Sequence, residues 1–137
     1  MIIYTDGSCL NNPGPGGWGF ILIGDEYDDE VSGGEKYTTN NRMELTAVIE
    51  AIKYVKTDQH IDIYSDSQYV VKGITEWVDS WVKKNWKKVK NVDLWRELHS
   101  LNSEYDISWN WVKAHSTNEY NNRVDLIARE RAMEYNT

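Results

Sequence analysis

Two short apolar segments of the chain end in the same way, and this similarity constrains the fold more than any other feature. Residues 2–5 run into Asp6, and the alternating residues 61–65 run into Asp66. A stretch with apolar residues at helical spacing separates them, and a helical crossover lets two strands pair in parallel. Both aspartates would then follow the carboxyl ends of adjacent strands, where ligands gather in open α/β sheets.

The periodicity of apolar residues predicts the remaining elements. Strands are expected over residues 2–5, 18–23, 30–37, 61–65 and 107–111. Helices are expected over residues 45–55, with helix-capping candidates at 38–41, and near 70–81, 92–101 and 120–135. The Asn-, Pro- and Gly-rich residues 11–17 predict a turn, and the first three strands form an antiparallel meander. A length of 137 residues fits a single domain over residues 1–137.

The charge of the chain is unevenly distributed. The formal net charge is −7, which by itself argues against a nucleic-acid partner. Residues 72–96, however, carry seven Lys and Arg against three Asp and Glu, together with Trp77, Trp81, Trp86 and Trp95. Cations mixed with aromatic rings are typical of a nucleic-acid groove. The alternative is a solvated helical face whose tryptophans enter the core.

Cysteine usage and hydropathy limit the cellular setting. Cys9 is the single cysteine, so it forms no internal disulfide, and no Cys/His spacing indicates a zinc site. The N-terminus does not resemble a signal peptide, and no apolar run approaches the ~20 residues of a membrane span. The expected setting is a reducing, cytoplasmic compartment without a membrane partner.

Four carboxylates lie where predicted helices and strands converge: Asp6, Glu44, Asp66 and Asp125. Each has a structural alternative, because Asp6 suits a turn, Asp66 suits a helix N-cap, and Glu44 suits the positive end of a helix dipole. Clustered carboxylates repel one another unless they are protonated or bind a cation. A site with oxygen ligands only selects hard ions such as Mg²⁺ or Mn²⁺.

Five motifs follow one another along nearly the whole chain. They are YTDGSC (4–9) with NPGPGG (12–17), TNNRMEL (39–45), SDSQYV (65–70), NVDLW (91–95), and WVKAH (111–115) with NRVD (122–125). With these motifs the chain resembles the type 1 ribonucleases H, close to the single-domain bacterial members. The resemblance implies a five-stranded mixed sheet of order 3-2-1-4-5 with helices on both faces. It also implies hydrolysis of the RNA strand of RNA–DNA hybrids, as in primer and R-loop removal, by a monomer.

The resemblance also assigns roles to residues. It implies that Asp6, Glu44, Asp66 and Asp125 hold two Mg²⁺ ions, with Mn²⁺ as a possible substitute, and that His115 is a mobile catalytic histidine. Two metal ions suit this reaction because they activate water and stabilise the leaving oxygen. Residues that would line the groove for the RNA strand are Cys9, Asn12, Asn40, Asn41 and Gln68. Thr39 and Asn91 would bind a DNA-strand phosphate, and Trp77 with the lysines after it would hold the DNA strand.

The sequence departs from the family pattern without losing a catalytic residue. The basic loop after Trp86 is short, and Tyr37 stands where relatives often have arginine, beside Lys36 as partial compensation. Residues 114–118 replace a more glycine-rich loop, which bears on the mobility of His115. We expect no separate hybrid-binding domain before Met1, and weaker hybrid binding than in strongly cationic relatives. The alternatives are a non-catalytic hybrid-binding module, a reverse-transcriptase-derived domain that needs a partner, and an integrase-like nuclease domain.

Overall fold

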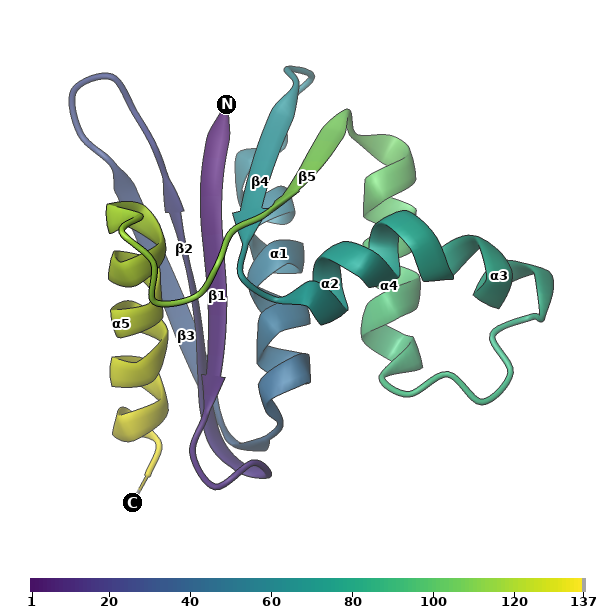
Figure 1. The fold of residues 1–137 in the computed structure, drawn as a ribbon, viewed down its shortest axis with the longest axis horizontal. Helices are drawn as coiled ribbons and strands as arrows, with labels where there is room; N and C mark the ends of the chain where they lie inside the picture. Colours follow the sequence, from purple (N-terminus) through teal and green to yellow (C-terminus); the bar gives the residue numbers. More distant parts are fainter. Residues whose placement is uncertain (137) are drawn as a thin grey trace.

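A computed structural model describes residues 1–136 and shows a mixed five-stranded sheet flanked by helices (Figure 1). The strands are β1 (Ile2–Cys9), β2 (Gly14–Leu22), β3 (Asp29–Thr38), β4 (Ile61–Ser65) and β5 (Ile107–Trp111). The helices are α1 (Asn40–Val55), α2 (Gln68–Lys72), η1 (Gly73–Trp77), α3 (Val78–Lys83), α4 (Val92–Glu104) and α5 (Glu119–Glu134).

The strand order is β3-β2-β1-β4-β5, which confirms the predicted α/β fold. β1 pairs with β2 in antiparallel and with β4 in parallel orientation, and β5 continues the parallel half. The register places Thr5 beside Ser65, and Ser65 beside Trp111. Asp66 therefore leaves β4 at the same edge of the sheet at which β1 carries Asp6.

The alternation of side chains along the strands builds two apolar layers, one on each face of the sheet. Ile3 and Phe20 point into the larger core against α1, with Trp95 of α4, whereas Tyr4 and Ile21 pack against α5. In Figure 1, α5 crosses one face of β1–β3, and α1 lies behind the sheet. Among residues 1–136, none of the helices has the length and apolar character required of a membrane span.

The predicted turn over residues 11–17 is wrong for its second half, because β2 already begins at Gly14. The glycines there serve close packing. A Cβ on Gly17 would lie 2.2 Å from the main-chain oxygen of Ala128 in α5, and a Cβ on Gly16 would lie 2.4 Å from Thr38 Cγ2. This packing lets β1 and β2 pair as far as Cys9, four residues beyond the predicted end of the first strand.

The helix predicted near residues 70–81 is a continuous helical path made of α2, the π-helical segment η1 and α3. Gly73 opens η1, and a Cβ there would lie 2.0 Å from the ring of Trp95. The tryptophans of residues 72–96 were expected either to lie in a nucleic-acid groove or to enter the core, and the structure shows both situations. Trp95 is fully buried and packs against Trp81, as the core interpretation predicts, whereas Trp77 stays 38% exposed.

Candidate metal centre

Three carboxylates from three elements converge at the carboxyl edge of the parallel strands. Asp6 lies within β1, Glu44 lies on α1, and Asp66 directly follows β4. One carboxylate oxygen of each lies within 4.8 Å of the other two. Asp6 and Glu44 are almost fully buried, with 2% and 6% of their surfaces exposed. Three acids so close together in a buried site require protons or a cation.

Gly7 fixes the approach of β1 to α1. Its main-chain N–H donates to Asp6 Oδ1 at 2.9 Å and to Glu44 Oε1 at 2.7 Å. A Cβ at this position would lie 2.3 Å from the main-chain nitrogen of Glu44, so only glycine allows the contact. The local sequence Asp6-Gly7 therefore brings a strand carboxylate and a helix carboxylate to one donor.

The structural alternatives for two of these acids are wrong. Ser67, and not Asp66, is the N-cap of α2, because its hydroxyl accepts a hydrogen bond from the Val70 N–H. Glu44 lies beyond the first turn of α1, which contains no acidic residue, so its carboxylate is not placed to stabilise the helix dipole there. Asp6 does accept from the next main-chain amide, as a turn aspartate would. The helix N-cap and helix-dipole roles therefore do not explain the positions of Asp66 and Glu44.

The crowding of acids raises their pKa values. Burial raises the pKa of Asp6 to about 8, and the negative charge of Asp66 adds to the shift. Burial also raises the pKa of Glu44 well above its usual value, followed by the charge of Asp6, and burial raises that of Asp66. A bound divalent cation would lower these pKa values again, because it stabilises the ionised forms of the three acids. The all-oxygen donor set fits a hard cation.

Asp125 lies on α5 beside the three-carboxylate group, where its carboxyl group is within hydrogen-bond reach of Asp6, and it has a second partner on its own helix. Its Oδ2 pairs with the Arg129 guanidinium at 3.2 Å. Its negative charge contributes to the raised pKa of both Asp6 and Asp66, which shows its proximity. In this arrangement Asp125 neighbours the group that the other three acids form, and its carboxylate is partly neutralised by Arg129.

Asn121 is a residue of the site that the sequence reasoning missed. It lies one helical turn before Asp125 on α5, is 1% exposed, and hydrogen-bonds to the Asp66 carboxylate, which partly offsets the rise of that pKa. Its amide oxygen, Oδ1, is buried without a hydrogen-bond partner among the described residues. The signal in the sequence was its spacing of four residues from Asp125, which places both on one helix face.

His115 lies in the loop between β5 and α5. It is exposed and has a backbone φ of 54°. This left-handed conformation is uncommon for residues other than glycine, although asparagine, aspartate and histidine adopt it more often than most. The loop ends at Asn118, whose side chain caps α5 by accepting from the Asn121 N–H.

The residues proposed for substrate binding fall into two groups. Asn12, Thr39, Asn40, Asn41 and Asn91, together with Lys90, line a hollow of about 410 Å³. Several of them also hold the local structure. Asn12 Oδ1 accepts from the Asn40 N–H at 2.9 Å, and the Thr39 hydroxyl caps α1 by accepting from the Arg42 N–H. The hollow is thus a polar surface with fixed side chains.

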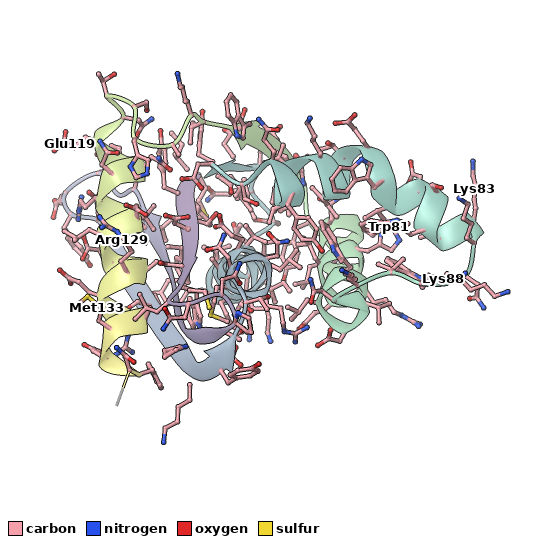
Figure 2. The ribbon with its side chains drawn as sticks, turned by 60° about the horizontal axis from the view of Figure 1, so that its bottom comes forward. Trp81, Lys83, Lys88, Glu119, Arg129 and Met133 are labelled. Carbon is pink, nitrogen blue, oxygen red and sulfur yellow. The ribbon has the colours of Figure 1, made fainter. Side chains whose placement is uncertain are left out.

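The second group, Cys9, Gln68 and Trp77, does not line this hollow. Cys9 is half-buried, with its thiol 3.3 Å from the Thr38 carbonyl oxygen. Gln68 is exposed at the start of α2, two residues after Asp66. Trp77 packs against Trp81, with 6.0 Å between ring centroids. Figure 2 shows Trp81, Lys83 and Lys88 at the end of the molecule opposite α5, which carries the labelled Arg129.

Comparison with known proteins decides the family. The RNase H family profile matches residues 1–133, nearly the whole chain. The chain belongs to the RNase H family.

Relatives from bacteria agree with this assignment. A ribonuclease H of Hahella chejuensis is 54% identical over 131 residues, which cover 92% of this chain and 88% of that protein. A ribonuclease H of Ehrlichia canis is 50% identical over 136 residues, covering 96% and 93%. These similarities confirm the resemblance found in the motifs and the prediction of a ribonuclease.

Solved RNase H structures share the fold. LC9-RNase H1, a type 1 RNase H with the type 2 active-site motif, is 31% identical with a TM-score of 0.87, covering 98% of this chain and 72% of that one. LC11-RNase H1 in complex with an RNA/DNA hybrid is 23% identical with a TM-score of 0.76, covering 99% of both chains. The predicted strand order is thus the order of an RNase H fold.

Proposed function

We propose that this chain cleaves the RNA strand of RNA–DNA hybrids endonucleolytically and uses Mg²⁺. The observation that carries the proposal is the group of Asp6, Glu44 and Asp66, whose oxygens lie within 4.8 Å of one another in a member of the RNase H family. The structure of LC11-RNase H1 with a hybrid supports the choice of substrate. Suitable hybrids include RNA primers and R-loops.

The four carboxylates would hold the metal ions. Asp6, Glu44 and Asp66 are already gathered, and Asp125, which reaches Asp6 and also pairs with Arg129, would complete the set. When bound, two Mg²⁺ ions supply activation of the attacking water and stabilisation of the leaving 3′ oxygen. Mn²⁺ has the same preference for oxygen ligands and is proposed as a substitute. Asn121 and Gly7 orient the carboxylates by hydrogen bonds to Asp66, Asp6 and Glu44.

His115 is proposed to move a proton or to assist product release. An imidazole can both accept and donate a proton, which suits proton exchange with the leaving group or the surrounding water. Its exposed position on the loop before α5 gives it access to solvent. The loop of residues 114–118 would set how far the imidazole reaches.

Substrate selection is proposed to use one set of residues for the RNA strand of the hybrid and another set for the DNA strand. Cys9, Asn12, Asn40, Asn41 and Gln68 would contact the shallow minor groove, where 2′-hydroxyls distinguish RNA from DNA. Thr39 and Asn91, on the hollow beside α1, would bind a phosphate of the DNA strand. The exposed Trp77 and the lysines after it would hold that strand further along. These roles are compatible with the capping contacts that keep the side chains in place.

The chain is proposed to act as one domain and as a monomer in the cytoplasm. All the carboxylates and polar residues assigned above come from a single chain, so the site requires no second subunit. A single cysteine suits a reducing compartment.

Substrate comparison tests the proposal. Equal concentrations of RNA–DNA hybrid, RNA duplex and DNA duplex, each labelled on one strand, are incubated with the chain and Mg²⁺. The expected result is internal cleavage of the RNA in the hybrid only. Similar cleavage of the DNA duplex would contradict the substrate, and hybrid binding without any cleavage would favour the binding-module alternative.

A further inference from the structure

Asn91 lines the polar hollow beside α1 in a backbone conformation that few residues adopt. It lies directly before α4 at φ 56° and ψ 35°, in the left-handed region that asparagine tolerates better than most residues. Its side chain makes no capping hydrogen bond to the first turn of α4, although asparagine before a helix commonly does. The Asn91 amide is instead held by residues of α1 and α2.

Arg42 of α1 holds the oxygen of this amide. One guanidinium N–H donates to Asn91 Oδ1 at 3.3 Å. Because a guanidinium only donates hydrogen bonds, the atom that faces Arg42 must be the amide oxygen and not the amide nitrogen. Arg42 is itself held by two hydrogen bonds to the Asp93 carboxylate, at 3.0 Å and 2.8 Å. The orientation of the Asn91 amide is therefore fixed.

Tyr69 of α2 holds the nitrogen of the same amide. Asn91 Nδ2 donates to the Tyr69 hydroxyl at 3.2 Å, and the indole N–H of Trp95 donates to that hydroxyl at 2.8 Å. Trp95 is fully buried, so the core of the protein sets the position of the hydroxyl. Among residues 1–136, Tyr69 is the one acceptor for the NH₂ group of Asn91, which leaves its second hydrogen for a ligand.

A hydrogen-bond donor held in this way suits an anion. Lys90 lines the same hollow of about 410 Å³ and adds a positive charge. The phosphates of a nucleic-acid duplex lie on its outside, so a bound hybrid can present one to a surface hollow with all its bases paired. Arg42 does not line the hollow, and its charge is balanced by Asp93. Its contact with Asn91 therefore orients the amide and does not bind the phosphate.

We propose that Arg42 and Tyr69 are positioning residues that present the NH₂ group of Asn91 to a phosphate of the DNA strand. The inference rests on the proposed function, which assigns that phosphate to Thr39 and Asn91. Arg42 joins these two residues, because its main-chain N–H also donates to the Thr39 hydroxyl at 3.3 Å. A side chain that is ordered before the substrate arrives loses less entropy on binding, so the network raises the affinity for the hybrid.

Tyr69→Phe tests the proposal by removing a single oxygen. The ring can keep its contacts with Trp95 and Trp77, and no charge changes. Hybrids carry one neutral methylphosphonate at successive positions of the DNA strand. Their affinities are measured by fluorescence anisotropy in a Glu44→Gln background, which keeps the RNA intact if the proposed reaction occurs. One position is expected to weaken binding about tenfold more than its neighbours, and Asn91→Ala is expected to abolish this difference. Tyr69→Phe is expected to reduce it to about threefold or less.

Three further variants separate positioning from folding. Tyr105→Phe removes a hydroxyl from another tyrosine that packs against the same core, and it is expected to keep the full difference at the one phosphate. Arg42→Met removes the other contact of the Asn91 amide and is expected to act as Tyr69→Phe does, which provides the test if Tyr69→Phe does not fold. Tyr69→Phe combined with Asn91→Ala should bind no more weakly than Asn91→Ala alone, because Tyr69 acts through Asn91. Urea unfolding shows which variants are folded.

A full tenfold difference in folded Tyr69→Phe or Arg42→Met would overturn the positioning role and leave the proposed function standing. If no DNA position distinguishes Asn91→Ala from the chain with Asn91, the assignment of Asn91 to a phosphate and the inference built on it are both overturned. Failure of the proposed reaction is read separately, as uncut RNA with the chain that retains Glu44. Absence of hybrid binding by the Glu44→Gln chain would overturn both proposals together.

Discussion

Asp6 and Glu44 share one hydrogen-bond donor, the main-chain N–H of Gly7, at 2.9 Å and 2.7 Å. The shared donor couples a strand to a helix residue that lies 37 positions later in the chain. Because the contact is main chain to side chain, it depends on backbones that approach more closely than any side chain at position 7 would permit. The three-carboxylate group is therefore a product of backbone packing as much as of residue choice.

Replacement of Gly7 by alanine is expected to disrupt this arrangement. The new Cβ would lie 2.3 Å from the main-chain nitrogen of Glu44, so α1 must shift away from β1. We expect a loss of about 1–3 kcal/mol in the free energy of unfolding, together with weaker Mg²⁺ binding. Urea denaturation and a metal titration measure the two effects. As a control, Gly19→Ala meets the Ile127 side chain at 3.1 Å, away from the carboxylates, and should leave metal affinity unchanged.

Without metal, the stability of the fold is expected to fall as pH rises from about 4 to about 8. Asp6 in the unfolded chain ionises near 3.8, whereas its pKa in the fold is raised to about 8. Between these values the folded state binds more protons than the unfolded state, so rising pH favours unfolding. Asp6→Asn removes this titration.

Chemical denaturation in a chelator tests this pH dependence. The variant Asp6→Asn should be more stable than the unsubstituted chain at pH of about 8, with the difference vanishing near pH of about 4. Addition of Mg²⁺ should stabilise the unsubstituted chain more than the variant at the higher pH. Equal stabilities of the variant and the unsubstituted chain at the higher pH without metal would show that ionisation of Asp6 does not destabilise the fold.

Arg129 is expected to compete with metal for Asp125. Its guanidinium lies 3.2 Å from Asp125 Oδ2, and about half of its side chain is exposed, so the ion pair adds little stability. Arg129→Gln should change the free energy of unfolding by less than about 0.5 kcal/mol. It should tighten Mg²⁺ binding about threefold by removing a positive charge near the site. Arg131→Gln, which affects the Glu134 pair further along α5, is the control, and equal effects would exclude the competition.

His115 is expected to affect turnover more than binding. If the imidazole moves a proton, His115→Ala should lower kcat by about 10²-fold while hybrid affinity and Mg²⁺ affinity stay within about twofold. Steady-state kinetics and a binding titration separate the two. His99→Ala removes a histidine that packs on Trp86, away from the carboxylates, and should leave kcat unchanged. A matching loss of hybrid affinity in His115→Ala would instead indicate a role in holding substrate.

Much of the fold could be predicted because its signals are local. The strands at 61–65 and 107–111 have the predicted bounds, since alternation of apolar residues marks a half-buried strand. The glycines at 14–17 misled the prediction because the same residue type serves turns and close packing. Their packing against Thr38 and α5 involves residues far away in sequence, which no local pattern reveals.

The candidate site could be predicted only in part. The residues Asp6 and Asp66 stood out because similar motifs follow two neighbouring strands, and the structure brings them together with Glu44. Asn121 went unnoticed because asparagine is common near helix starts, and its contact with Asp66 depends on how α5 crosses the sheet. The pairing of Asp125 with Arg129 was visible as an i,i+4 spacing, but its importance depends on the distance to the other acids.

The most direct measurement is cleavage of a labelled RNA strand in an RNA–DNA hybrid by the unsubstituted chain and by Asp66→Asn. We expect internal RNA cleavage that requires Mg²⁺, and loss of cleavage in Asp66→Asn with hybrid binding retained. The substitution keeps the size of the side chain, removes its charge and replaces one carboxylate oxygen by an NH2 group. Cleavage by Asp66→Asn at the rate of the unsubstituted chain would contradict a reaction centred on these carboxylates.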